Sequence, residues 1–242
     1  MITLDHNDVI GFIKRRNRDY SKKLTNFYNY SRVVSLAYFE RMVETYEFDS
    51  MSVAIVSGDK HEPELRLMEP SCVDIFSFED DQRYDLDKPW EEVLHNTRQY
   101  DLVMANQVLE HISNPRQGLM NLAGLARNGG YIYLTIPTIN CIHGEPYFYS
   151  AGYHPRFLNR LAEETGLKVI EAGHWGSRKY LLNAVIGDWL TIRQLKRASL
   201  LRNRFRLRLP VDFWSDGRFN EPGIITDCWV LLQKPEKETL WI

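Results

Sequence analysis

The segment Tyr100-Asp101-Leu102-Val103-Met104-Ala105-Asn106-Gln107-Val108-Leu109-Glu110-His111-Ile112 decides the fold of this chain. Its first half is apolar apart from Asp101, which predicts a strand buried on both faces, as in a parallel sheet covered by helices. Its second half places amide, carboxylate and imidazole groups directly after that strand. Open α/β sheets bind ligands at this end of their strands.

The sequence on either side alternates short apolar runs with amphipathic stretches, which is typical of βαβ units. We therefore predict an α/β, Rossmann-like fold with helices on both faces of the sheet. Seven strands are expected, at residues 52–57, 72–78, 81–86, 100–106, 131–136, 167–172 and 226–233. Helices are expected at residues 63–68, from 89 to 94, from Pro115 to a stop at Asn128-Gly129-Gly130, and from Pro155 to a stop at Gly166.

Two segments lie outside this pattern. Residues 1–50 repeat apolar side chains at helical spacing and form a predicted helical N-terminal segment, so the α/β domain that contains the sheet is expected at 51–242. A stretch at about 177–223 is too long for a bare connection and is predicted to be a helical insert. Its arginines, from Arg193 to Arg208, either bind phosphate or form a solvated helix face.

The composition and net charge of the chain bear on its partners and on its cellular compartment. The chain has 242 residues and a net charge of -2, so no nucleic-acid partner is expected. Its three cysteines, Cys72, Cys141 and Cys228, are widely spaced and indicate neither a disulfide framework nor a zinc knuckle. No apolar run is long enough to span a membrane, and a cytoplasmic protein is expected. The sequence is compatible with further domains and with a homo-oligomer.

The quoted segment resembles the fourth-strand motif of class I S-adenosylmethionine-dependent methyltransferases of the "methyltransferase type 11" kind. Companion motifs follow in the expected order: Asp85-Leu86, Asn128-Gly129-Gly130-Tyr131 and Ile136-Pro137. The similarity covers approximately residues 52–235. It implies a seven-stranded sheet in the order 3-2-1-4-5-7-6 with the last strand antiparallel. The cofactor implied is S-adenosyl-L-methionine, with S-adenosyl-L-homocysteine as product.

The resemblance also implies which residues bind that cofactor. Gly58 lets the backbone approach the methionine end, and Ser57 and Asp59 add polar groups beside it. Glu79, next to Phe78, is expected to hold the ribose, with Asp74 and Asp80 as alternatives. The remaining candidates are Asp85 and Leu86 near the adenine, and Asn106, Gln107 and Val108 on the pocket floor. The family's usual glycine-rich turn is reduced here to one glycine.

Methyl transfer to a hydroxyl requires a proton acceptor, and three histidines are candidates: His111, His143 and His154. His154 alternatively caps a helix. Tyr149, Tyr153 and Arg156 are candidate acceptor-binding residues, because aromatic faces stack on sugars. The aromatic and histidine-rich loop after residue 136, together with similarity to methyltransferase domains that decorate polysaccharides, favours O-methylation of a sugar or glycan.

Two other functions remain open from sequence. One is N- or C-methylation of a small metabolite, and the other is a non-catalytic methyltransferase-like binding domain, which the single-glycine turn permits. Histidine spacing predicts no dedicated metal site, although a loosely held Mg²⁺ stays open.

Overall fold

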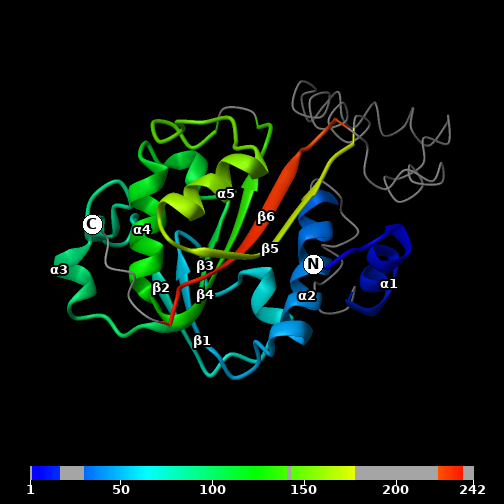
Figure 1. The fold of residues 1–242 in the computed structure, drawn as a ribbon, viewed down its shortest axis with the longest axis horizontal. Helices are drawn as coiled ribbons and strands as arrows, with labels where there is room; N and C mark the ends of the chain where they lie inside the picture. Colours follow the sequence, from blue (N-terminus) through cyan, green and yellow to red (C-terminus); the bar gives the residue numbers. More distant parts are fainter. Residues whose placement is uncertain (1, 17–29, 141–142, 178–222, 237–242) are drawn as a thin grey trace, which may run out of the picture.

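The computed structural model describes residues 2–16, 30–140, 143–177 and 223–236. Six strands form one mixed sheet in the order β2-β1-β3-β4-β6-β5 (Figure 1). The strands are β1 (Ser52–Val56), β2 (Cys72–Phe76), β3 (Tyr100–Asn106), β4 (Ala126–Pro137), β5 (Lys168–Trp175) and β6 (Asp227–Gln233). The predicted insert lies almost entirely outside the described residues.

The sheet confirms an α/β, Rossmann-like fold, but not the predicted seventh strand. Residues 81–86 do not form a strand: a 3-10 helix, η2 (Gln82–Tyr84), lies there, with Asp81 as its N-cap. The Asp81 carboxylate accepts from the Arg83 backbone N–H at 3.0 Å, which favours a turn over an extended strand. Strands β1 to β4 pair in parallel, and β6 is antiparallel to both of its neighbours, as predicted for the last strand.

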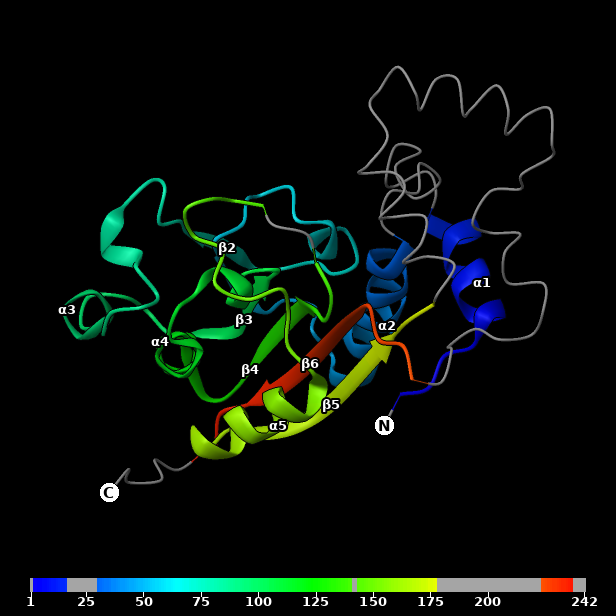
Figure 2. The ribbon, with the colours of Figure 1, turned by 90° about the horizontal axis from the view of Figure 1, so that it is seen from above.

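Helices cover both faces of the sheet (Figures 1 and 2). On one face α1 (His6–Arg16) and α2 (Tyr30–Tyr46) share an apolar core with Leu102, Met104 and Trp229. On the other face α4 (Pro115–Leu125) and α5 (Pro155–Glu164) pack on Val103 and the alternate residues of the sheet. This alternation along β3 explains why its sequence is apolar throughout. The helical N-terminal residues therefore belong to the same core as the sheet.

Three shorter helices connect the strands: η1 (Pro63–Arg66), α3 (Glu91–Leu94) and η3 (Leu109–His111). As predicted, Asn114 caps α4, since its side chain accepts from the Gln117 N–H at 3.3 Å, and Pro115 follows as the first helical residue. The helix ends at Leu125, earlier than the predicted stop at Asn128, because Ala126 already pairs with Tyr100 in the sheet. Among the described residues no helix has the length and apolar character needed to cross a membrane.

Candidate cofactor and acceptor site

The carboxyl edge of the sheet carries two strained turns side by side. Ser57 follows β1 and Gln107 follows β3, and each has a φ of 55° although neither is glycine. Backbone hydrogen bonds hold both: the Ser57 N–H donates to the Phe76 carbonyl at 2.8 Å and the Gln107 N–H to the Thr135 carbonyl at 2.7 Å. Left-handed backbone at non-glycine residues costs energy and gathers at functional sites. The two turns mark this edge as the candidate site.

The turn after β1 holds Gly58 against the side chain of Glu62. A Cβ on Gly58 would lie 2.8 Å from Glu62 Oε1 and 2.8 Å from Ile55 Cγ2, so a larger residue here requires these side chains to move. The space next to the glycine backbone is thus taken by a carboxylate of the same loop. Ser57 and Asp59, the other predicted cofactor residues of this turn, are exposed, and the Asp59 carboxylate accepts from the His61 N–H.

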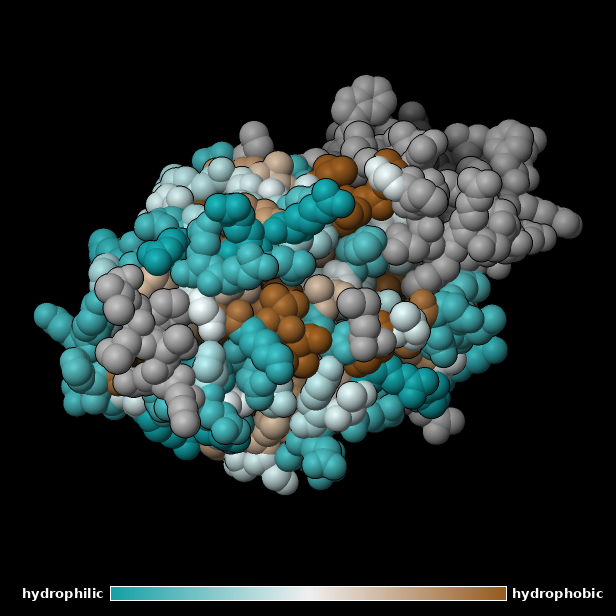
Figure 3. Space-filling view, viewed as in Figure 1, coloured by the Kyte–Doolittle hydropathy of each residue, from teal (hydrophilic) through white to brown (hydrophobic). Residues whose placement is uncertain are grey.

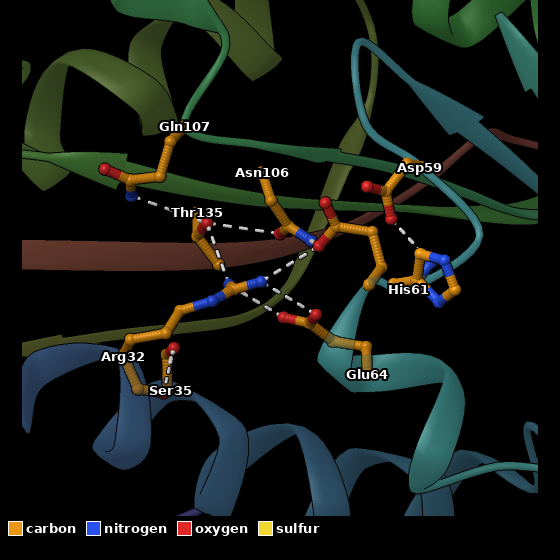
Figure 4. Close-up of polar contacts among 9 residues, drawn as sticks. Arg32, Ser35, Asp59, His61, Glu64, Asn106, Gln107 and Thr135 are labelled. Atoms are coloured by element: carbon orange, nitrogen blue, oxygen red, sulfur yellow. Dashed lines mark hydrogen bonds and ion pairs between the residues drawn. The ribbon is translucent and has the colours of Figure 1, made fainter. Parts of the chain in front are cut away.

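Arg32 of α2 lies at the centre of an ion cluster below this turn (Figure 4). Its guanidinium contacts both carboxylate oxygens of Glu64, at 2.7 and 2.8 Å, and Glu62 Oε2 at 3.1 Å. The Asn106 amide also donates to Glu62 Oε2 at 3.1 Å. Thr135 links Arg32 to Asn106, with distances of 3.3 and 3.1 Å. The cluster joins α2, the turn after β1 and the ends of β3 and β4.

The cluster contains more carboxylates than its guanidinium can balance. Burial raises the pKa of Glu64 to about 7, although Arg32 acts in the opposite direction and the Glu62 carboxylate adds to the rise. Burial likewise raises the pKa of Asp227, at the start of β6, to about 6. Arg32 itself has a raised pKa because of its acidic neighbours. This edge thus holds the carboxyl groups of Glu62, Glu64 and Asp227 beside the single guanidinium of Arg32.

The other predicted cofactor residues lie as follows. Asn106 belongs to the ion cluster, the Gln107 amide approaches Thr135 and Asp227 at 3.5 Å, and Val108 is buried in the core. Phe78 contacts the Tyr147 ring with centroids 5.6 Å apart, which brings the loops after β2 and β4 together. Figure 3 shows a largely hydrophilic face with separate apolar patches in the view of Figure 1.

The residues expected to bind the ribose and the adenine lie mostly in loops and turns and not at strand ends. Glu79 is exposed in the loop after β2, as is its alternative Asp80, whereas Asp74 is paired with Arg98 and Tyr100 at 2.6 Å. The Asp85 carboxylate accepts from the Asp87 N–H at 3.0 Å and contacts Lys88 at 3.1 Å. Its neighbour Leu86 is buried in the core, so the turn after η2 replaces the expected strand end.

The structure brings two of the three candidate histidines together. The rings of His111, in η3, and His143, in the loop after β4, have centroids 4.8 Å apart at an interplanar angle of 90°. The Glu110 backbone carbonyl accepts from the N–H groups of Tyr149 and Ser150, at 3.0 and 3.1 Å, which fastens that loop over η3. His111 Nδ1 lies 2.7 Å from the Tyr147 carbonyl oxygen.

The third histidine and the remaining acceptor candidates lie near α5. His154 is the N-cap of that helix: its Nδ1 accepts from the Arg156 N–H at 3.1 Å, which is the alternative role considered from sequence. Tyr153 stacks on Phe157 with centroids 4.9 Å apart, and Arg156 is exposed. Tyr149 is exposed on the loop that crosses η3.

Sequence reasoning missed Arg32, Glu62 and Glu64. A single arginine in α2 and two glutamates at the start of η1 carry no local signal, and only the fold brings them together. Glu110 was noted in the motif, but not that its carboxylate is fully buried, where its pKa rises to about 7 because of that burial.

Comparisons with known proteins give a family and a set of distant structures. The family model described as "Methyltransferase domain" matches residues 43–172. Among curated proteins, nothing matches.

Three solved structures resemble the chain at low sequence identity. An O-methyltransferase from a multienzyme of Brevibacillus brevis, in complex with S-adenosyl-L-homocysteine, is 14% identical, with 81% of this chain and 71% of that chain covered and a TM-score of 0.46. A 1,6-didemethyltoxoflavin-N1-methyltransferase from Burkholderia thailandensis is 9% identical, with 97% and 92% covered and a TM-score of 0.46. A protein of Bacillus halodurans assigned as a methyltransferase is 10% identical, with 83% and 98% covered and a TM-score of 0.45.

The match to the family model spans more than half of the chain and includes β1 to β4, α4, α5 and the motif at residues 100–112. It confirms the class of enzyme that this motif predicted. The chain belongs to the methyltransferase domain family.

Proposed function

We propose that this methyltransferase transfers a methyl group from S-adenosyl-L-methionine to a hydroxyl group of a small molecule or glycan, at the carboxyl edge of the sheet. One observation carries the proposal. The loop after β4, with His143, is fastened over η3, with His111, directly beyond the strand that ends in Asn106. Groups able to accept a proton thus lie next to the strand end where this fold holds its ligand.

The residues of the ion cluster match the chemistry of the methyl donor. S-adenosyl-L-methionine carries an ammonium, a carboxylate and a sulfonium, and has a net positive charge. Glu62 offers acceptors for the ammonium and Arg32 a donor for the carboxylate, while the surplus negative charge around Arg32 favours a cation. Because Glu62 occupies the space beside Gly58, we expect its carboxylate to become a ligand contact when the donor binds.

When bound, the donor supplies a methyl group activated by its sulfonium. The protein contributes mainly by positioning the acceptor in line with that methyl, and it removes the hydroxyl proton. His111 suits proton acceptance, because Nδ1 donates to the Tyr147 carbonyl and leaves the lone pair on Nε2. His143 lies beside it, whereas the side chain of His154 is engaged as a helix cap.

Aromatic side chains of the same loop support a sugar or glycan acceptor. Tyr147 and Tyr149 are exposed, and Phe78 approaches Tyr147 from the loop after β2. Such rings stack on the apolar face of a sugar while their edges stay hydrated. Methylation of a neutral amine needs no proton removed beforehand, and a greasier pocket would suit a metabolite, so N- or C-methylation is the less favoured alternative.

A second function, ligand binding without methyl transfer, is favoured by one observation. The Glu62 side chain takes the place beside Gly58 that a glycine-rich turn keeps open, and the turn at residues 57–62 contains no second glycine. Such a domain would keep the fold and the ion cluster but would not bind the donor.

Calorimetric titration of the full chain with S-adenosyl-L-methionine separates the two functions. We expect saturable binding that is weakened in Asn106→Ala and in Glu62→Ala, with Arg160→Ala, an exposed residue of α5, as the matched control. Absence of heat and of a thermal shift would leave the binding-domain alternative. If binding occurs, incubation with labelled donor and hydroxyl-bearing sugars tests the acceptor class.

A further inference from the structure

Glu110 is a buried carboxylate with no hydrogen-bond partner among the described residues. The residue has no exposed surface, and neither carboxylate oxygen has a partner there. Buried polar groups are almost always hydrogen-bonded, and a buried carboxylate is stable only beside a proton, a cation or a donor. The position of Glu110 next to two histidines indicates what the partner is.

The three side chains form one cluster of metal-ligand type. One ligand atom each from Glu110, His111 and His143 lies within 4.8 Å of the other two. A cation bound at about 2.1 Å from each would bring these atoms to about 3–3.5 Å from one another. His143 lies on an exposed loop, so an inward shift of at most about 2 Å completes the site.

The surroundings of His111 are those of a preorganised ligand. Its Nδ1 donates to the Tyr147 carbonyl at 2.7 Å, which fixes the tautomer and leaves Nε2 to coordinate. Gly144, with a φ of 65°, lets the loop pass close to the ring: a Cβ there would lie 3.0 Å from His111 Cε1. The Glu110 carbonyl holds the same loop from below through two backbone N–H groups.

We propose that Glu110, His111 and His143 bind a divalent first-row cation such as Zn²⁺ or Mn²⁺. Two imidazoles and one carboxylate favour these ions over Mg²⁺, which takes oxygen ligands and keeps its water. Three protein ligands also leave coordination positions open.

A catalytic role for this cation rests on the proposed function. An acceptor hydroxyl that enters an open position becomes more acidic, so its proton is lost without a strong base. With the cation bound, the two histidines serve as ligands, and the cation replaces His111 in assisting removal of the proton. The proton passes to water or buffer as the hydroxyl oxygen forms its bond to the methyl carbon and the bond from that carbon to sulfur breaks.

Metal binding can be measured independently of methyl transfer. The full chain, stripped with a chelator, is titrated with Co²⁺ by visible absorption and with Zn²⁺ by calorimetry. We expect saturation at one ion per chain, and loss of more than about 100-fold in affinity in Glu110→Gln and in His143→Ala. His95→Ala removes an exposed histidine at the end of α3 and should bind as the wild type does.

Each result decides the proposal. No binding by the wild type, or equal binding by Glu110→Gln and His143→Ala, overturns it. His143→Ala is the safer variant because its side chain is exposed, and circular dichroism checks that both variants fold. Cation binding without binding of S-adenosyl-L-methionine refutes the proposed function and keeps the metal site, whereas the reverse result refutes the site alone.

Discussion

The ion pair of Arg32 with Glu64 gives a quantitative prediction. The Glu64 side chain is fully buried and Arg32 is 18% exposed, and two contacts of 2.7 and 2.8 Å join them. Arg32→Met keeps most of the side-chain volume and removes the charge. It leaves a buried carboxylate without its cation, which costs about 3–5 kcal/mol of unfolding free energy where that carboxylate is ionised.

The cost should depend on pH in a defined direction. Because the pKa of Glu64 is raised to about 7 in the folded state, this group stabilises the protein most at low pH, and that contribution is lost as pH rises from about 4.5 to 7. In Arg32→Met the pKa of Glu64 rises further, so the variant continues to lose unfolding free energy as pH rises above 7. At about pH 6 the folded carboxyl is protonated in both proteins, and the variant should lose only about 1–2 kcal/mol for its missing hydrogen bonds.

Urea unfolding at several values between about pH 6 and pH 9 measures this difference. The difference in unfolding free energy between the wild type and Arg32→Met should widen above pH 7. The double variant Arg32→Met with Glu64→Gln carries no ionisable group at that position, so its difference from the wild type should not show the widening expected for Arg32→Met. A gap in Arg32→Met that is the same at both ends of the range would refute the reasoning.

Three further variants test single contacts. Asp101→Asn weakens the hydrogen bonds and the ion pair with Ser52 and Arg127, and should cost about 1–3 kcal/mol of unfolding free energy in urea at pH 7. The cost should be smaller at about pH 3, because those partners lower the pKa of Asp101 and the stability it contributes is lost as pH falls. An equal cost at both pH values would contradict this. His154→Ala should lower the unfolding free energy by about 0.5–2 kcal/mol, and His154→Asn should restore it, because the residue caps α5; a large loss of methyl transfer in both would instead place His154 in catalysis. Gly152→Ala puts a Cβ 2.3 Å from the Pro137 carbonyl oxygen at a φ of 141°, and should cost about 2–4 kcal/mol in thermal unfolding. Gly223→Ala, at a φ of 79° and with no atom of the described residues within 4 Å of the added Cβ, should cost only about 1 kcal/mol of backbone strain, and equal costs would show that the clash is not the cause.

Local sequence pattern predicted most of the sheet because its strands are short, buried apolar runs. Residues 100–106 and 52–56 form adjacent strands as expected, and α4 begins where Asn114 and Pro115 indicated. Residues 81–86 were wrongly predicted as a strand, since a short polar stretch with Asp at its start also suits a turn. There the Asp81 carboxylate accepts from the backbone N–H two residues on, Leu86 is buried in the core, and Tyr84 packs against the core while partly buried.

The sequence predicted which edge of the sheet holds the site, but not which side chains meet there. Gly58, Asn106 and Gln107 follow strands, so their edge of the sheet is known once the strands are known. The pairing of Arg32 with Glu64 depends on how α2 packs against η1, which no local pattern contains. The contact of His111 with His143 likewise depends on the path of the loop after β4.

The most direct test of the account is a crystal structure of the full chain grown with S-adenosyl-L-homocysteine. We predict density for the ligand between the turn at Gly58 and the end of β3 at Asn106, with its amino-acid end at Arg32 and Glu62. Glu62 still packed against Gly58, with the ligand absent or bound elsewhere, would contradict the central claim that this edge holds the methyl donor.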